Sequence, residues 1–198
     1  MLRIESVEAS SVTCGLGTTR DRLARMSLWK WLGLERGAAD QEFDSLADAE
    51  ATLDGLDQKR RRYVACFAYI LTRSARADQQ MTDGEAREME RILARHAGIS
   101  EAQAAVVVRL AGQQARRSGG TDDFVITREF DRVASHEQKI ALIDALFTVS
   151  SVDASIVTVE DNEIRRIANE LRIEHGEYIA VRARHLAHLQ VLKPTDSA

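Results

Sequence analysis

The segment "ADQQMTDGE" at residues 77–85 lies between two stretches with helical periodicity, and a related acidic segment, "VDASIVTVEDNE", occupies residues 152–163. The two align without a gap when Asp78 is placed on Asp153, an offset of 153 − 78 = 75 residues. The alignment continues along the helix that follows, where apolar residues coincide: Met89, Ile92 and Leu93 with Ile164, Ile167 and Ala168. These matches predict an internal duplication of a helix–loop–helix unit.

The composition is typical of an all-helical protein. The 198 residues include a single proline, Pro194, and 44% are hydrophobic, so the chain can build a core. Apolar residues recur at i, i+3, i+4 and i+7, and the last helix is expected from about Glu174 to Leu192. We therefore predict an all-α bundle of about seven helices, built from two related halves. Four residues are expected in its core: Phe67, Leu93, Leu146 and Ile167.

Three regions are expected along the chain: a tail at 1–37, an acidic arm with helical character at 38–57 and a helical domain at 58–192. The tail contains a short apolar segment around Trp29 and Trp31, which is typical of a contact with a membrane surface or with a partner. Met26 opens a sequence typical of a natural start, so the residues before it are interpreted as an upstream extension.

Helix capping explains part of the repeated segment. Thr82 and Glu85 have the spacing of a capping box, in which the hydroxyl accepts a backbone N–H of the first turn and the carboxylate accepts the N–H of the cap residue. Thr158 and Asp161 are predicted to do the same in the second copy, and Ser100 opens a further box.

The two aligned aspartates have no place in such a box. Asp78 and Asp153 come near the end of the preceding helix, where a negative charge interacts unfavourably with the helix dipole. Their position indicates a second role, either in hydrogen bonding their own loop or in binding a cation.

The sequence resembles the TerB family of tellurite-resistance proteins and is similar to the N-terminal domain of the DjlA co-chaperone. In each copy a helix ends at an aspartate, and an apolar residue and a glutamate follow at the start of the next helix. The segments "EQKIALIDALFTVSSVD" at 137–153 and "VEDNEIRRIANELRI" at 159–173 resemble the compact bacterial members especially closely. The resemblance implies the TerB-like bundle over residues from about 58 to 190.

The resemblance also implies an acidic, metal-binding surface. The candidate ligands are Asp78, Glu85, Asp153 and Glu160, and the candidate cation is calcium, which prefers oxygen ligands. The chain departs from the family at the glycine after each aspartate, which is Gln79 in the first copy and Ala154 in the second. Because these residues lack the conformational freedom of glycine, capping with loop hydrogen bonds is favoured over an ion site.

The sequence favours a binding protein over an enzyme. It contains no HExxH segment, P-loop, dinucleotide fingerprint or nucleophile elbow. His96 aligns with Leu171, which predicts a place at the edge of the core, and His185 and His188 are expected to face solvent. Cys66 is expected to be a small buried hydrophobe. The net charge of −4 does not favour a nucleic-acid partner.

We expect a non-enzymatic binding or scaffold module for a protein partner, which the TerB resemblance connects with tellurite and other stress responses. The alternative is a co-chaperone-like or membrane-peripheral interaction domain anchored by Trp29 and Trp31, and a metal-dependent enzyme is a third class. The sequence has no apolar run of roughly 20 residues, and its N-terminus lacks the compact apolar core expected of a signal peptide. The expected location is therefore the cytoplasm, with contact to the inner membrane in the alternative.

Overall fold

The computed structural model describes residues 55–77, 81–118, 120–153 and 155–189. Their helices are α4 (Gln58–Ala77), α5 (Asp83–Ala97), α6 (Glu101–Ser118), α7 (Asp123–Val133), α8 (His136–Ser150), α9 (Thr158–Glu170) and α10 (His175–Ala183), followed by the short 3-10 helix η1 (Leu186–His188). These residues contain no strand, so the prediction of an all-α bundle of about seven helices is confirmed.

All of the described residues belong to one compact unit of the chain. The predictions for the tail with Trp29 and Trp31 and for most of the acidic arm lie outside the described residues.

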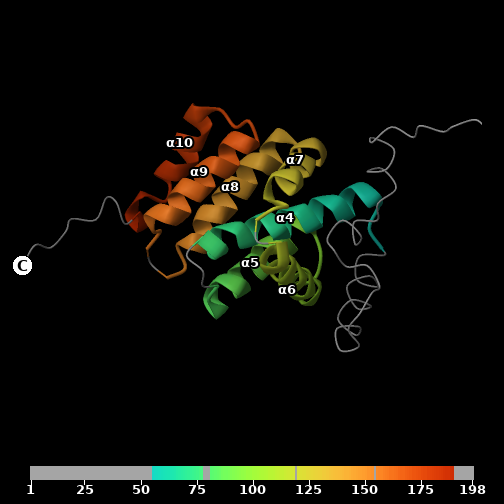
Figure 1. Cartoon of the computed structure of the whole chain (residues 1–198). Coiled ribbons are helices and arrows are strands. Elements are labelled where there is room, and N and C mark those ends of the chain that lie inside the picture. Colours follow the sequence, from blue (N-terminus) through green and yellow to red (C-terminus); the bar gives the residue numbers. More distant parts are fainter. Residues whose placement is uncertain (1–54, 78–80, 119, 154, 190–198) are drawn as a thin grey trace, which may run out of the picture. The chain divides into compact units, whose positions relative to one another are not determined.

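Helix α4 is the centre of the bundle. It packs against α5, α6, α7, α8 and α9, and Figure 1 shows α5 and α6 on one side of it and the later helices on the other. Every residue from Tyr63 to Ala75 is buried. The helix is therefore covered around most of its circumference, as expected for the central helix of a bundle.

The four predicted core residues are all fully buried: Phe67, Leu93, Leu146 and Ile167. The ring of Phe67 lies 5.6 Å from that of Tyr63 and 6.0 Å from that of Phe130, distances at which aromatic rings attract each other. Cys66 is buried and free, and burial raises the pKa of its thiol. The predicted helix registers and the buried cysteine are confirmed.

The duplication is visible in the structure. Helices α5 and α9 begin 158 − 83 = 75 residues apart, which is the offset of the sequence alignment. The two repeated segments also meet, because a Cβ added to Gly84 would lie 2.9 Å from Cγ1 of Val152. Glycine at this position lets the loop after α8 approach the first turn of α5.

The offset changes to 74 residues at the C-terminal ends of α5 and α9. Gly98 and Arg172 follow the two helices with left-handed backbones, φ 61° and φ 58°. The same backbone hydrogen bond closes each end: Ile99 N to Ala94 O at 3.2 Å and Ile173 N to Ala168 O at 3.0 Å. Counted from the aligned starts of the two helices, the left-handed residue after α9 therefore comes one residue earlier than the one after α5.

This shortening shows that the alignment of His96 with Leu171 is wrong, whereas its predicted place at the edge of the core agrees with its contact to Phe67. Ala97, not His96, is the structural counterpart of Leu171, and both Ala97 and Leu171 are buried. His96 is exposed, although its ring stacks on Phe67 with centroids 5.5 Å apart. An ungapped alignment could not detect the loss of one residue within the helix.

The predicted last helix is too long. Helix α10 ends at Ala183, and the chain then turns so that the carbonyl of His188 accepts the N–H of Ile156 at 2.6 Å. Leu189 pairs with Ile156 in an isolated bridge and is buried. Burial of Leu189 against the loop before α9 overrides the helical preference of this segment.

Candidate functional site

The repeated glutamates, Glu85 and Glu160, cap their own helices. Oε2 of Glu85 accepts the N–H of Thr82 at 2.8 Å, and the hydroxyl of Thr82 accepts the N–H of Glu85 at 3.2 Å, so the predicted capping box is confirmed. Oε2 of Glu160 accepts the N–H of Val157 at 2.9 Å. Both glutamates are buried. Each carboxylate satisfies a backbone donor at the positive end of its helix.

The predicted capping box of Thr158 and Asp161 is wrong. Helix α9 starts one residue earlier than that prediction requires, with Val157 as its cap. Valine has no hydroxyl, so this helix start has only the carboxylate half of the box. Asp161 instead accepts hydrogen bonds from Arg182 at 2.7 and 2.9 Å and from the hydroxyl of Tyr178 at 3.1 Å. Burial alone would raise the pKa of Asp161, but Arg182 and Tyr178 lower it.

The structure describes one of the two aspartates of the candidate metal site. Asp153 is exposed, and Asp78 lies outside the described residues. Within the described part of the chain, no group of three or more His, Cys, Asp or Glu side chains is placed to hold a metal ion. One oxygen of Glu85 and one of Glu160 already accept a backbone N–H. The described carboxylates therefore do not by themselves fit a calcium site, which stays a prediction that depends on Asp78.

Arg73 of α4 is a buried cation that the sequence analysis missed. Its guanidinium donates to Glu163 at 2.7 and 3.0 Å, to Glu170 at 2.9 Å and to the hydroxyl of Thr127, and it lies 3.5 Å from Asp123. Its side chain has no exposed area. Burial alone would lower the pKa of Arg73, but the hydrogen bond to Glu170 and the charges of the three carboxylates raise it.

Two further side chains complete this Arg73 network. Nε of Arg166 lies 3.1 Å from Glu163, and the hydroxyl of Tyr69 donates to Asp123 at 2.9 Å. The network joins α4 to α7 and α9 by paired charges and hydrogen bonds. Because the buried Arg73 is enclosed by these carboxylates and Arg166 pairs with them from the surface, we interpret the network as structural.

The sequence contains a signal for Arg73. It follows Ile70 by three residues and Cys66 by seven, so it continues the face of α4 that those residues bury. A charged residue in such a register requires a buried partner. The partners themselves come from α7 and α9, and their convergence is not visible in the sequence.

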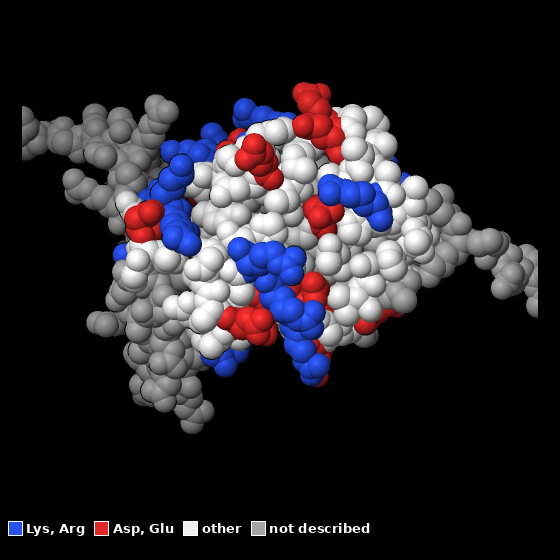
Figure 2. All heavy atoms as spheres, turned by 180° about the vertical axis from the view of Figure 1, so that it is seen from behind, with Lys and Arg blue, Asp and Glu red and all other residues white. Residues whose placement is uncertain are grey.

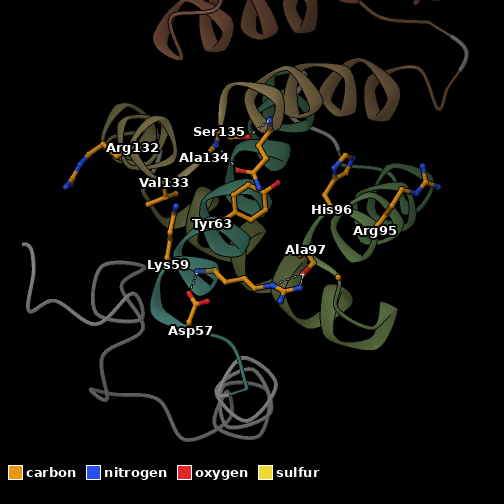
Figure 3. A pocket seen from close by; sticks show the side chains of 13 residues that line it. Asp57, Lys59, Tyr63, Arg95, His96, Ala97, Arg132, Val133, Ala134 and Ser135 are labelled. Atoms are coloured by element: carbon orange, nitrogen blue, oxygen red, sulfur yellow. Dashed lines mark hydrogen bonds between the residues drawn. The ribbon is translucent and has the colours of Figure 1, made fainter.

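A surface hollow of about 590 Å³ lies where α4, α5, the end of α7 and the start of α8 meet. Four cationic side chains line it, Lys59, Arg60, Arg95 and Arg132, against one carboxylate, Asp57. Figure 3 shows Lys59 and Asp57 on the same side of Tyr63, while the side chains of Arg95 and Arg132 point away from its ring on opposite sides. The hollow was not predicted, because its cations come from different helices.

The cations of the hollow have different surroundings. Arg60 donates to the carbonyl of Ala97 at 2.7 and 3.2 Å and so completes the C-terminus of α5. Arg132 pairs with Glu129 at 3.0 Å at the surface. Lys59 and Arg95 have no carboxylate of the described residues within ion-pair distance.

His96 and His185 each contact neighbouring side chains that account for their positions. His96 lines the hollow, and burial together with the charge of Arg95 lowers the pKa of its imidazole. His185 was expected to face solvent, but it stacks on Phe147 with centroids 5.4 Å apart and lies 3.0 Å from Asp144. Neither arrangement joins a histidine to a nucleophile.

The face of the molecule in Figure 2 carries charges of both signs, separated by uncharged areas. Such a mixture differs from the continuous basic face that nucleic-acid binding requires. Among the described helices, none has the length and apolar character needed to cross a bilayer.

The structure defines a class of protein, an all-helical bundle with two related helix–loop–helix halves. Residues 64–183 match the family described as "Tellurite resistance protein TerB", and this match covers more than half of the chain. The protein belongs to the TerB family. The matched residues reach from α4 to the end of α10 and include the Arg73 network and both glutamate caps. No curated protein and no solved structure matches the chain.

Proposed function

We propose that the protein is a non-catalytic binding module that acts in a tellurite or related stress response. The single observation that carries the proposal is the hollow at α4, α5 and α8, whose lining is rich in fixed cations. Arginine and lysine bind anions without having to change protonation state. A hollow lined in this way has a positive charge that is complementary to an anionic ligand.

The chemistry of the lining supports binding over catalysis. His96 is the imidazole of the lining, and no hydrogen bond joins it to Tyr63 or Ser135, the hydroxyl groups of the lining. A catalytic nucleophile normally requires a base within hydrogen-bond reach. Cys66, the described cysteine, is buried away from solvent. The ionisable groups therefore favour a site that holds its ligand unchanged.

The test is to incubate the full-length protein with a panel of small anions and follow thermal unfolding. A bound compound should raise Tm by mass action, and its NMR spectrum after release should be unchanged. Conversion of the compound into a product would contradict the proposal, particularly if His96→Asn abolished the conversion.

The alternative of a membrane-peripheral or co-chaperone-like domain rests on the Trp29 and Trp31 segment. It would be favoured if the full-length protein sedimented with anionic liposomes and the Trp29→Ser, Trp31→Ser variant did not. Retention of liposome binding by the double variant would show that the segment is not needed for membrane binding.

A further inference from the structure

The terminal segments that lie outside the described residues differ in charge. Residues 38–54, which form most of the acidic arm, contain six Asp or Glu residues and no Lys, Arg or His. Residues 1–37 contain six Lys or Arg against four Asp or Glu, and residues 190–198 contain one Lys and one Asp. Of these segments, the acidic arm alone has an excess of acidic side chains.

The acidic arm enters the described structure at the hollow. The first described residue comes two positions before Asp57, which lines the hollow. The carboxylate of Asp57 accepts the N–H of Arg60 at 2.9 Å, and the carbonyl of Leu56 accepts Nε of Arg61 at 2.7 Å. These bonds fix the end of the arm at the start of α4. Since each extended residue spans about 3.3 Å, residues 38–54 can reach every part of the hollow.

The cations of the hollow are spread over a face of the bundle and do not converge on one point. Four of them are exposed and come from α4, α5 and α7: Lys59, Arg60, Arg95 and Arg132. Figure 3 shows the side chains of Arg95 and Arg132 pointing away from Tyr63 on opposite sides. Charges spread in this way complement a segment with carboxylates along its length better than a single compact anion.

The tether makes weak ion pairs effective. One exposed ion pair favours contact by a factor of only about 1.4 to 5. Six carboxylates on one segment multiply such factors, and a short tether supplies an effective concentration on the order of mM. Closely spaced like charges also repel one another, and contact with a cationic face reduces this repulsion.

We infer that residues 38–54 of the acidic arm dock on the hollow of their own chain, through contacts with Lys59, Arg95 and Arg132. The docked arm covers the hollow, so an anionic ligand has to displace it. The inference goes beyond the proposed function, because docking of the arm is measured with no ligand present.

The test uses the full-length protein with a nitroxide spin label in the arm. Ser45→Cys provides the attachment point and Cys14→Ser removes a competing thiol, while the buried Cys66 reacts poorly. The label weakens the NMR signals of nearby backbone amides. We expect a strong loss of signal at Gly98, which lines the hollow, and a weak loss at Gly84 in the first turn of α5.

Matched variants of the acidic residues separate docking from the effect of the tether alone. The arm variant neutralises three carboxylates of the arm: Glu42→Gln, Asp48→Asn and Glu50→Gln. The control neutralises three carboxylates of the tail: Glu5→Gln, Glu8→Gln and Asp21→Asn. The arm variant should lower the ratio of docked to undocked chains at least about three-fold, because three ion pairs are lost. An equal signal loss at Gly98 in the wild type, the arm variant and the control would overturn the inference.

A second pair of variants tests the cations. Lys59→Gln with Arg95→Gln should lower the ratio of docked to undocked chains at least about two-fold. Arg87→Gln with Arg109→Gln removes the same charge from exposed positions of α5 and α6 that do not line the hollow, and it should leave the signal loss at Gly98 unchanged. Equal effects of the two double variants would contradict docking on the hollow.

A mixed sample identifies the chain that supplies the arm. Spin-labelled chains without isotope are mixed with isotope-labelled chains that carry no spin label, and we expect no signal loss at Gly98 of the latter. A loss equal to that within one chain would show that the arm docks on a second copy, and it would overturn the inference.

Failure of the inference and failure of the proposed function give different results. If the arm docks and no anion of the panel binds, the proposed function is wrong and the inference stands. If an anion binds but neutralising the arm leaves the signal loss at Gly98 unchanged, the inference is wrong and the proposed function stands.

Discussion

The two halves of the bundle share their buried apolar positions and differ in their polar ones. Leu71 of α4 and Leu146 of α8 are 75 residues apart, and both are fully buried. The helix that follows each of them starts with a buried glutamate bonded to the backbone of its cap residue. The contrast lies in the cap itself, which is Thr82 in the first half and Val157 in the second.

The contrast is larger on the preceding helix. Arg73 in α4 corresponds to Thr148 in α8 by the 75-residue offset. Arg73 is enclosed by carboxylates from α7 and α9, whereas the hydroxyl of Thr148 bonds to a carbonyl of its own helix at 2.9 Å. The comparison teaches that the two halves share the buried apolar residues that build the scaffold. The polar contacts of each half depend on the helices that pack against it.

Arg73→Met should have the largest effect of the changes that test this comparison. It removes the buried cation beside Glu163, Glu170 and Asp123 and leaves them the largely exposed Arg166. Removing one partner of a buried ion pair costs about 3–5 kcal/mol. Denaturant unfolding should show a loss of stability of that size. The matched Thr148→Val should cost less than about 1 kcal/mol, and a similar loss for both would contradict the asymmetry.

Leu71→Ala and Leu146→Ala should cost similar amounts, because the two leucines occupy equivalent buried positions. Truncation of a buried leucine costs about 2–5 kcal/mol, which denaturant unfolding can measure for each variant. A loss below about 0.5 kcal/mol, as at an exposed position, would show that the register of that helix is misplaced.

Thr82→Ala and Val157→Thr should have opposite, smaller effects. The first removes the hydroxyl that accepts the N–H of Glu85, at a cost of about 1 kcal/mol. The second supplies the missing hydroxyl at the start of α9 and should stabilise by up to about 1 kcal/mol. Thermal unfolding of both variants would check this, and destabilisation by Val157→Thr would mean that the valine methyl groups contribute more than a cap.

Local signals were sufficient for much of the fold. The helix registers followed from apolar spacing, and the capping boxes of Thr82 with Glu85 and of Ser100 with Gln103 followed from side chains three residues apart. These features depend on residues within one or two helical turns. The sequence alone is enough to define them.

The wrong predictions concern features that depend on contacts between residues far apart in the sequence. The cap of α9 is Val157, although valine is not a preferred N-cap residue. The helix starts there because the buried Glu160 accepts the N–H of Val157. Helix α10 stops early because Leu189 is buried against the loop before α9. The hollow likewise depends on the approach of α5 to the start of α4, which periodicity does not reveal.

The central claim is that the repeated acidic segment builds helix starts rather than a cation site. Thermal unfolding of the wild type and of Asp153→Asn, each with and without excess calcium, tests it most directly. Binding at 100 times Kd would stabilise by about 2.7 kcal/mol, which corresponds to a rise in Tm of several degrees for a chain of this length. We predict no calcium-dependent rise in either protein. A rise of several degrees in the wild type that is abolished in Asp153→Asn would contradict the claim.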